Sequence, residues 1–265
     1  MNNKLSLIGT IAGDIIGAPF ERMSAAKPIG FLLFNPKYSF TDDTVMTIAT
    51  AAKLINNSDY VTEYQRFGRK YFNRGYGGMF KKWIQEEHPE PYNSFGNGSG
   101  MRVSPVAYWY DTLEEVLAEA ELSASVTHNH EEGIKGAKAI AAAVFMARKG
   151  KQKAEIKAFI SDTFAYNLDR TLDEIRPTYF FDVTCQGSVP EAIIAFLESE
   201  NFEDCIRLAI SIGGDTDTIA AMAGGIAEAY YSGVPELIYD KVLTYLDQEL
   251  TEVLTIFSEK INTKK

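Results

Sequence analysis

Apolar residues recur with the period of an α-helix along most of the chain, and few segments alternate with the period of two that is typical of strands. The stretch "HEEGIKGAKAIAAAVFMAR" shows this pattern clearly. Its apolar side chains would share one helix face, and they are Ile134, Ala137, Ala141, Val144 and Phe145. Most apolar runs are rich in alanine instead of β-branched residues. The chain is therefore predicted to be an all-α, compact multi-helix protein.

Helical periodicity also locates the individual elements. The expected helices cover roughly 5–18, 44–56, 59–73, 112–126, 130–148, 151–166, 189–199, 201–211, 216–231 and 235–257. Small residues are frequent in segments such as "TIAAMAGGIAEAYY", so we expect close helix–helix approach in the centre of the bundle. Two glycine-rich stretches, "RGYGG" (74–78) and "YNSFGNGSGMRVSP" (92–105), are expected to be non-helical loops that carry binding residues.

Length and composition narrow the class of protein. A chain of 265 residues with 46% hydrophobic and 23% charged residues is expected to form one domain over 1–265. Its net charge of −10 disfavours nucleic acid or an anionic membrane as a partner. The two cysteines are too few for a disulfide framework or a Cys-rich zinc site. We interpret the first twenty residues as a core helix and not as a signal peptide, because Asp14 interrupts their apolar run. We expect a monomeric cytoplasmic protein.

Two acidic clusters stand out. "FTDDT" (40–44) contains Asp42 and Asp43, and "GGDTDT" (213–218) contains Asp215 and Asp217; each lies directly before an apolar helix. Helix capping explains one carboxylate per helix, since aspartate and threonine are favoured at helix N-termini. A site for hard cations such as Mg²⁺ would explain all four, because Mg²⁺ prefers oxygen ligands. On the residues alone, both explanations stay open.

Other acidic metal motifs fit less well. The DDxxD motif of prenyl synthases requires a third aspartate, whereas residues 42–46 read Asp-Asp-Thr-Val-Met. Di-iron bundles use Glu-x-x-His pairs, and no glutamate stands three residues before any of the three histidines. Neither cluster has the twelve-residue loop ending in glutamate that an EF-hand requires.

In combination, these motifs resemble the ADP-ribosylglycohydrolase superfamily. The matching pieces follow the order of the family and span nearly the whole chain. They are "GDIIGAPFE" (13–21), "FTDDT" (40–44), "RGYGG" (74–78), "SFGNGSGMRVSP" (94–105), "TH" (127–128) and "GGDTDTIAAMAGGIAEAYY" (213–231). Each piece alone is weakly specific, whereas six in order are highly specific.

The resemblance implies an all-α fold with a binuclear Mg²⁺ centre, in which Mn²⁺ can replace Mg²⁺. Its implied metal ligands are Thr41, Asp42, Asp43, Asp215, Asp217 and Thr218. It implies Glu21 as the catalytic carboxylate, acting with Asp42 and Asp43. The residues implied to contact the substrate are Gly75, Tyr76, Gly77, Ser94, Phe95, Gly96, Asn97, Gly98, Met101 and His128.

Simpler explanations exist for several of these residues. Glu21 could be a surface residue after a proline turn, the glycine stretches could be bare turns, and His128 could be structural. His130 is expected to cap the helix that follows it, and Cys185 is expected to be structural.

The reaction implied by the resemblance is hydrolysis of the bond between ADP-ribose and an acceptor, with arginine as the first choice of acceptor. The alternatives are O-linked ADP-ribose (on serine or as O-acetyl-ADP-ribose), ADP-ribose binding without cleavage, and phosphoester hydrolysis. The expected partner is therefore an ADP-ribosylated protein or a small molecule that contains ADP-ribose.

Overall fold

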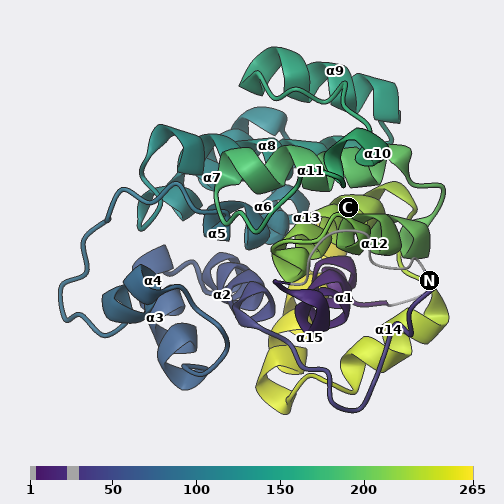
Figure 1. The fold of residues 1–265 in the computed structure, drawn as a ribbon. Coiled ribbons are helices and arrows are strands. Elements are labelled where there is room, and N and C mark those ends of the chain that lie inside the picture. Colours follow the sequence, from purple (N-terminus) through teal and green to yellow (C-terminus); the bar gives the residue numbers. More distant parts are fainter. Residues whose placement is uncertain (1–3, 23–29, 265) are drawn as a thin grey trace.

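The computed structural model describes residues 4–22 and 30–264. Within these ranges the regular structure is helical, apart from one isolated β-bridge between Gly96 and Thr184, so the all-α prediction is confirmed (Figure 1). No helix of the described ranges combines the length and apolarity needed to cross a membrane.

Most of the helices follow one another through short connections, but longer segments precede the helices that begin at residues 42 and 98. Their bounds are α1 (Ile8–Gly17), the 3₁₀-helix η1 (Ala18–Phe20), α2 (Asp42–Asn56), α3 (Tyr60–Lys70), α4 (Gly78–Trp83), α5 (Gly98–Met101), α6 (Ser104–Trp109), α7 (Leu113–Ser125), α8 (Glu131–Arg148), α9 (Lys153–Phe164), α10 (Leu172–Ile175), α11 (Cys185–Glu198), α12 (Phe202–Ser211), α13 (Thr216–Tyr230), α14 (Glu236–Leu243) and α15 (Gln248–Thr263).

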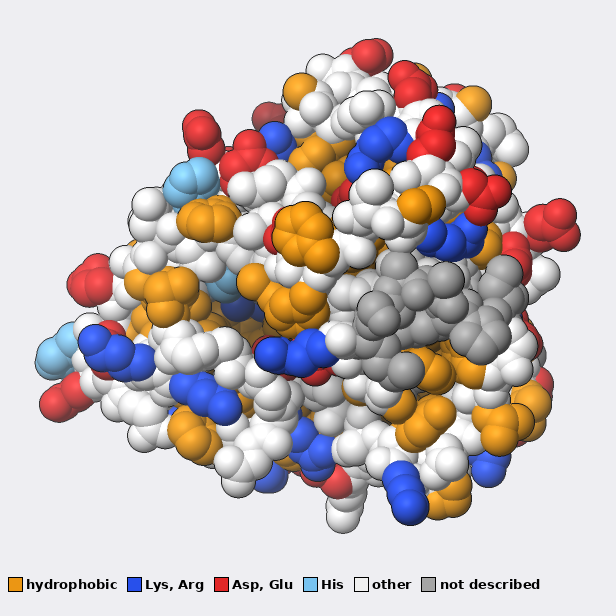
Figure 2. All heavy atoms as spheres, viewed as in Figure 1, with side chains coloured by type: hydrophobic (Ala, Val, Ile, Leu, Met, Phe, Trp, Pro, Cys, Tyr) orange, Lys and Arg blue, Asp and Glu red, His pale blue; other side chains and the backbone are white. Residues whose placement is uncertain are grey.

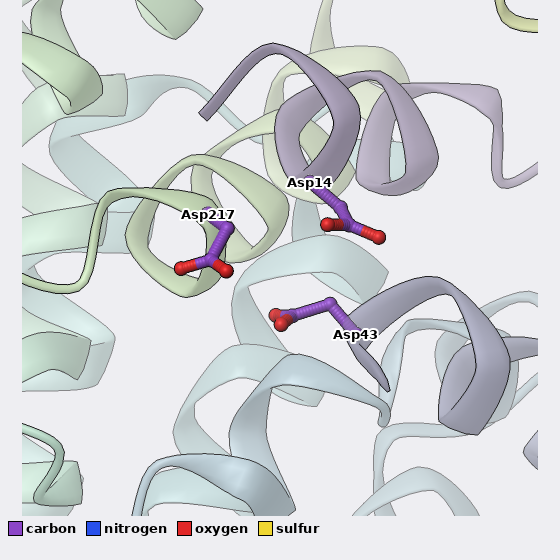
Figure 3. Close-up of side chains that lie close together, drawn as sticks. All are labelled: Asp14, Asp43 and Asp217. Atoms are coloured by element: carbon purple, nitrogen blue, oxygen red, sulfur yellow. The ribbon is translucent and has the colours of Figure 1, made fainter. Parts of the chain in front are cut away.

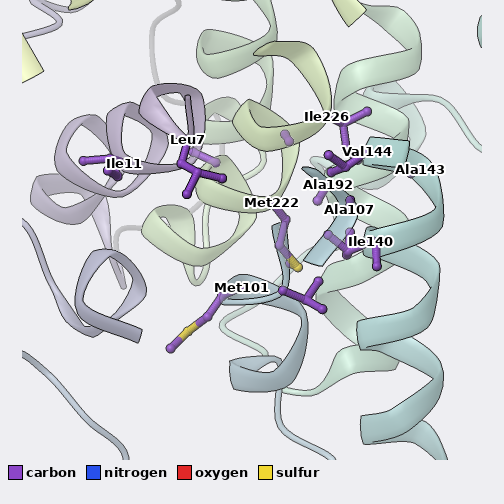
Figure 4. Packing of buried hydrophobic residues seen from close by; sticks show 14 of the residues in the cluster. Leu7, Ile11, Met101, Ala107, Ile140, Ala143, Val144, Ala192, Met222 and Ile226 are labelled. Atoms are coloured by element: carbon purple, nitrogen blue, oxygen red, sulfur yellow. The ribbon is translucent and has the colours of Figure 1, made fainter. Parts of the chain in front are cut away.

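Helix α13 forms the centre of the molecule. It packs against α1, α12, α11 and α8, and every residue from Thr216 to Glu228 is buried. On one side, Met222 and Ile226 of α13 face Ile140 and Val144 of α8 (Figure 4). A helix buried on all sides needs apolar or small residues around its whole circumference, which explains why its sequence lacks a polar face.

Helix α1 lies antiparallel against α13 at unusually short range. Its glycines recur every fourth residue, at Gly9, Gly13 and Gly17, and form the contacting face. A Cβ atom placed on Gly13 would lie 2.1 Å from the backbone oxygen of Ala220, and one on Gly9 would lie 2.4 Å from that of Gly224. Only glycine permits this approach, so the predicted close packing of helices is confirmed. It also brings the polar groups at each end of α1 close to those of α13.

Several helix bounds differ from the prediction by a few residues, and three of the differences concern the site or a helix cap. Helix α2 begins at Asp42 instead of residue 44, so both aspartates belong to its first turn. Helix α11 begins at Cys185 instead of residue 189, because Thr184 caps it by accepting a hydrogen bond from the amide of Gly187. The C-terminal pattern forms two helices, and Asp247 caps the second of them.

The stretch 92–105 is not wholly non-helical as predicted. It contains α5 and the start of α6. Pro105 lies in the first turn of α6, where its fixed φ angle suits the helix and its missing amide hydrogen costs nothing. The glycines of this stretch therefore lie in and around short helices instead of forming one long loop.

Candidate functional site

A cavity of about 880 Å³ opens where the N-termini of α2 and α13 face the glycine-rich segment 92–101. This volume is within the range typical of small-molecule sites. Figure 2 shows hydrophobic side chains gathered around a hollow on the face of the molecule seen in Figure 1. The apolar residues Met79, Phe95 and Val183 are exposed and line the cavity, so part of its rim is apolar.

Most of the residues predicted for the site line this one cavity. They are Glu21, Thr41, Asp42, Asp43, Gly75, Gly77, Ser94, Phe95, Gly96, Asn97, Gly98, Met101, His128, Asp215, Asp217 and Thr218. Segments almost 200 residues apart in sequence therefore meet, as the two-cluster hypothesis requires.

Tyr76 is the predicted residue that the structure does not bring to the cavity. Its side chain is buried against Phe80, with ring centroids 5.3 Å apart. Gly75 has φ of 103°, a left-handed conformation that lets the chain turn sharply just before Tyr76. The flanking glycines lie along the cavity while the tyrosine ring joins the core.

Three aspartates form a cluster at the cavity, and two of them, Asp43 and Asp217, line it. Asp14 of α1, Asp43 of α2 and Asp217 of α13 are buried, and each offers a carboxylate oxygen within 4.8 Å of the others (Figure 3). Two of them belong to the predicted clusters, and the third, Asp14, does not. Its signal in the sequence is a lone carboxylate inside an otherwise apolar helix.

Asp14 holds the start of α2 in place. Its carboxylate accepts hydrogen bonds from the amide of Thr41 at 2.9 Å, from the hydroxyl of Thr41 at 2.7 Å and from the amide of Thr44 at 3.1 Å. Both carboxylate oxygens are engaged in this way. Asp14 therefore caps α2 from a neighbouring helix and positions the aspartates of its first turn.

Capping does not account for the other aspartates. At the start of α2 the capping side chain is that of Thr41, which accepts from the amide of Asp43 at 3.4 Å. At the start of α13, Asp215 occupies the cap position without a side-chain capping bond. It accepts instead from the side-chain amide of Asn97 at 2.6 Å. The aspartates thus bring more negative charge than is required to cap the N-termini of α2 and α13.

This surplus shifts the titration of the cluster. Burial, followed by the charge of Asp14, raises the pKa of Asp42 to about 8. Burial also raises the pKa of Asp43 and of Asp217 well above the usual range, and the nearest carboxylates raise both further. The pKa of Asp215 is raised as well, again mainly by burial. Crowded carboxylates of this kind need protons or cations for neutralisation.

The cluster fits a hard cation. Oδ1 of Asp43 is buried and has no hydrogen-bond partner among the described residues. Its Oδ2 lies 3.2 Å from the hydroxyl of Thr41 and 3.3 Å from that of Thr218. Carboxylate and hydroxyl oxygens from two helices are the ligands that Mg²⁺ and similar ions prefer. The acidic cluster could therefore hold metal.

Glu21 follows η1 at the edge of the cavity. Its side chain is 36% exposed, and its Oε1 lies 3.2 Å from Nε of Arg22. The backbone amide of Arg22 donates to the carbonyl of Gly214 at 3.0 Å, which ties Glu21 to the loop that carries Asp215. The guanidinium of Arg22 also lies 4.7 Å from the ring centre of Phe181, another lining residue.

The glycine loop 94–98 is held by the segment 183–185. The amide of Asn97 donates to the carbonyl of Val183 at 2.7 Å, and the thiol of Cys185 donates to the carbonyl of Gly96 at 3.1 Å. The amide of Gly96 donates to the hydroxyl of Ser94 at 3.1 Å. The amide of Ser94 donates to the carbonyl of Thr127 at 3.4 Å, so three loop amides are already engaged within the protein. Cys185 is structural, as predicted.

Of the two neighbouring histidines, His130 caps α8 as predicted, accepting a hydrogen bond from the amide of Glu132 at 3.1 Å. His128 lies in the cavity wall and is 6% exposed. Arg102, which the sequence did not single out, also lines the cavity and is 1% exposed.

Comparisons with known proteins identify the family of this chain. The family model described as ADP-ribosylglycohydrolase matches residues 4–264. The ADP-ribosylhydrolase ARH3 of Gallus gallus is 29% identical, over 85% of this chain and 84% of its own. The ADP-ribosylarginine hydrolase Tri1 of Pseudomonas putida is 27% identical, over 90% of this chain and 73% of its own.

A solved structure described as an ADP-ribosylglycohydrolase-related protein complex shares the fold. It superposes with a TM-score of 0.71 at 23% identity and covers 96% of this chain and 95% of its own. The resemblance inferred from the six motifs is confirmed by the family match over nearly the whole chain. The chain belongs to the ADP-ribosylglycohydrolase family and is an enzyme of that hydrolase class.

Proposed function

We propose that this enzyme is a Mg²⁺-dependent hydrolase that releases ADP-ribose from modified arginine side chains of proteins. The observation that carries the proposal is the meeting of Asp43 and Asp217 in one cavity wall, with a buried oxygen of Asp43 left unpartnered. An acidic, partly enclosed cavity of this size suits a ligand that brings hydroxyl groups and a cationic leaving group.

The proposed cofactor is a pair of Mg²⁺ ions, with Mn²⁺ as a substitute. The residues that would hold them are Thr41, Asp42, Asp43, Asp215, Asp217 and Thr218. When bound, the ions would supply positive charge that orients ribose hydroxyls and makes water more acidic. Asp14 stays outside this set because the N-terminal turn of α2 already occupies both of its oxygens.

Glu21 is the proposed proton acceptor. It lies at the mouth of the cavity and is joined through Arg22 to the loop before Asp215. In the proposed step, a water oxygen bonds to the anomeric carbon of the distal ribose as the bond from that carbon to the acceptor nitrogen breaks. Glu21 takes a proton from the water, and the departing guanidine keeps the electron pair and receives that proton.

The glycine loop is the proposed seat of the diphosphate. Ser94, Gly96, Asn97 and Gly98 line the cavity there, and glycine lets an anion approach the backbone closely. Gly75, Gly77, Phe95, Met101 and His128 are proposed to line the rest of the ligand.

Arginine as the acceptor is supported by the acidic character of the cavity and by the Pseudomonas putida relative, which is named an ADP-ribosylarginine hydrolase. One observation favours the O-linked alternative. Arg22 places a cation directly beside Glu21, and a second cation on the leaving group would be repelled there, whereas a serine hydroxyl would not.

Release assays would separate these possibilities. The protein is incubated with arginine-linked and serine-linked ADP-ribosylated proteins, each with Mg²⁺ and with EDTA. We expect ADP-ribose from the arginine-linked substrate, and none with EDTA. Release from the serine-linked substrate alone would favour the O-linked alternative. Release of AMP or phosphate would indicate a phosphoester hydrolase, and binding without release would indicate a non-catalytic member.

We further propose one domain over 1–265 that acts as a monomer in the cytoplasm. The proposed partners are ADP-ribosylated proteins or small molecules containing ADP-ribose. The net charge of −10 supports a partner other than nucleic acid or an anionic membrane.

A further inference from the structure

A buried arginine without an acidic partner lies behind the glycine loop. Arg102 follows α5, is 1% exposed, and forms no ion pair with any described carboxylate. Its guanidinium lies 4.2 Å from the ring centre of Tyr64 and donates to the carbonyl of Ser123 at 3.0 Å. It also donates to the hydroxyl of Thr127 at 2.8 Å. Burying a charge is costly, so an unpaired guanidinium at a cavity wall requires an explanation.

The hydroxyl of Thr127 connects this arginine to His128. Oγ1 of Thr127 lies 2.8 Å from Nδ1 of His128. A guanidinium has donors only, so Thr127 must accept from Arg102, and its own hydroxyl hydrogen remains free to be donated. Thr127 is fully buried, and Nδ1 of His128 is the remaining hydrogen-bond partner of its side chain among the described residues.

This connectivity determines the tautomer of His128. If Nδ1 carried the proton, Oγ1 of Thr127 would accept twice and its hydroxyl hydrogen would be buried without an acceptor, which is costly. With Nδ1 as the acceptor, the proton of the neutral ring is on Nε2. A doubly protonated ring is disfavoured as well, because burial and then the charge of Arg102 hold the pKa of His128 well below its usual range.

Nε2 of His128 faces the glycine loop. A Cβ atom placed on Gly98 would lie 3.1 Å from Nε2, and one placed on Gly96 would lie 3.5 Å from it. Nε2 has no hydrogen-bond partner among the described residues, and the ring lines the cavity. Its N–H is therefore directed at the space where the diphosphate is proposed to lie.

We propose that Arg102 and Thr127 are positioning residues that hold His128 as the neutral Nε2–H tautomer, so that His128 donates a hydrogen bond to an oxygen of the bound diphosphate. The ligand part of this inference rests on the proposed function, whereas the tautomer rests on the protein alone. The relay places the positive charge of Arg102 behind a neutral donor and keeps that donor in one orientation.

The tautomer is tested on the ligand-free protein with ¹⁵N-labelled histidine. Nitrogen–proton correlation spectra at neutral pH distinguish the two tautomers, and the His128→Gln variant assigns the signals. We expect an unprotonated Nδ1 and a protonated Nε2 for His128. In Thr127→Val, which removes the hydroxyl, we expect this preference to be lost, and in Thr127→Ser, which keeps it, we expect it to persist. A protonated Nδ1 in the unmodified protein would overturn the proposal.

The role in binding is tested with ADP-ribose by calorimetry on the same variants. We expect Thr127→Val to weaken binding about five- to tenfold, the size of one net hydrogen bond, and Thr127→Ser to restore most of it. Equal affinities for all three proteins would overturn the role of the relay. If the unmodified protein shows the expected tautomer but does not bind ADP-ribose, the proposed function fails and the diphosphate is not the acceptor of this hydrogen bond.

Discussion

The two ends of the α1–α13 pair both bury carboxylates, but they satisfy them differently. At the start of α1, Glu228 stands alone and accepts from the amide of Gly9 at 2.8 Å. At the other end, Asp14 caps α2 in the same way, yet Asp43 and Asp217 are buried beside it. One carboxylate per helix N-terminus is a structural cap, whereas further carboxylates with an unpartnered oxygen indicate a cation.

The largest expected effect concerns Glu21, a carboxylate that caps no helix and lies at the same end of the α1–α13 pair as the cavity. Replacement of Glu21 by glutamine should lower turnover about 10²- to 10⁴-fold, because the proton acceptor is lost. ADP-ribose binding should be retained. Glu121→Gln, on the exposed face of α7, is the matched control and should not alter turnover. Unchanged turnover in Glu21→Gln would remove Glu21 from its proposed role.

The next largest effect is expected at the close contact between α1 and α13, which lies between the two ends of the pair. Gly13→Ala would place a Cβ atom 2.1 Å from the carbonyl oxygen of Ala220, in the middle of two packed helices. We expect the free energy of unfolding to fall by about 3 kcal/mol, the upper part of the range for overpacking. Gly78→Ala is the control, since a Cβ there meets nothing within 4 Å. Urea titrations that show equal losses for both variants would contradict the close contact.

At the Glu228 end, stability should depend on pH. Burial raises the pKa of Glu228 to about 7, from an ordinary value of 4.5. The folded state thus holds this proton more tightly than the unfolded chain. Its contribution is complete below pH 4.5 and is lost as the pH rises through about 7, a difference of up to about 3 kcal/mol.

Glu228→Gln isolates this term. Glutamine keeps an acceptor for the amide of Gly9 but cannot ionise, so the variant should gain stability relative to the unmodified protein between pH 5 and pH 8. Urea titrations across this range measure the difference in the free energy of unfolding between the two proteins. The carboxylates of the site contribute equally to both proteins and therefore do not affect this difference. Parallel pH profiles for the two proteins would show that Glu228 does not titrate as described.

The smallest expected effect is at the second cap. Asp14→Asn replaces one acceptor oxygen by a donor that faces the amides and hydroxyls of Thr41 and Thr44. We expect about 2 kcal/mol of lost stability, as for a strong N-cap, together with weaker Mg²⁺ binding, because the first turn of α2 loses its support. Loss of Mg²⁺ binding with full stability would instead make Asp14 a direct ligand.

Much of the fold and of the site could be predicted from the sequence. Helical periodicity is a local signal, so it predicts the longer helices, although a cap such as Thr184 or Asp247 shifts their bounds. It does not predict the short helices α4, α5, α6 and α10, which have too few turns to show a period. The clusters around Asp42 and Asp217 were recognised because two carboxylates before an apolar helix are unusual. Their approach in one cavity depends on the tertiary structure, and in the sequence only the family resemblance predicts it.

The residues that the sequence analysis missed have roles that depend on tertiary contacts. In the sequence Asp14 only interrupts an apolar run, because its partners lie about 30 residues away at the start of α2. Arg102 and Thr127 belong to motifs of the sequence, but the sequence predicts no role for them, because their relay to His128 exists only after folding. Tyr76 is predicted at the site because of its neighbouring glycines, but its ring packs into the core.

The central claim is that the surplus carboxylates of the site bind divalent cations. It is tested most directly by calorimetric titration of Mg²⁺ into the EDTA-treated protein and into Asp43→Asn. We predict saturable binding to the unmodified protein and at least about tenfold weaker binding to the variant. Without metal, Asp43→Asn should be the more stable of the two, because it relieves crowded negative charge. Absence of saturable Mg²⁺ or Mn²⁺ binding to the unmodified protein, or equal binding to both, would contradict the account.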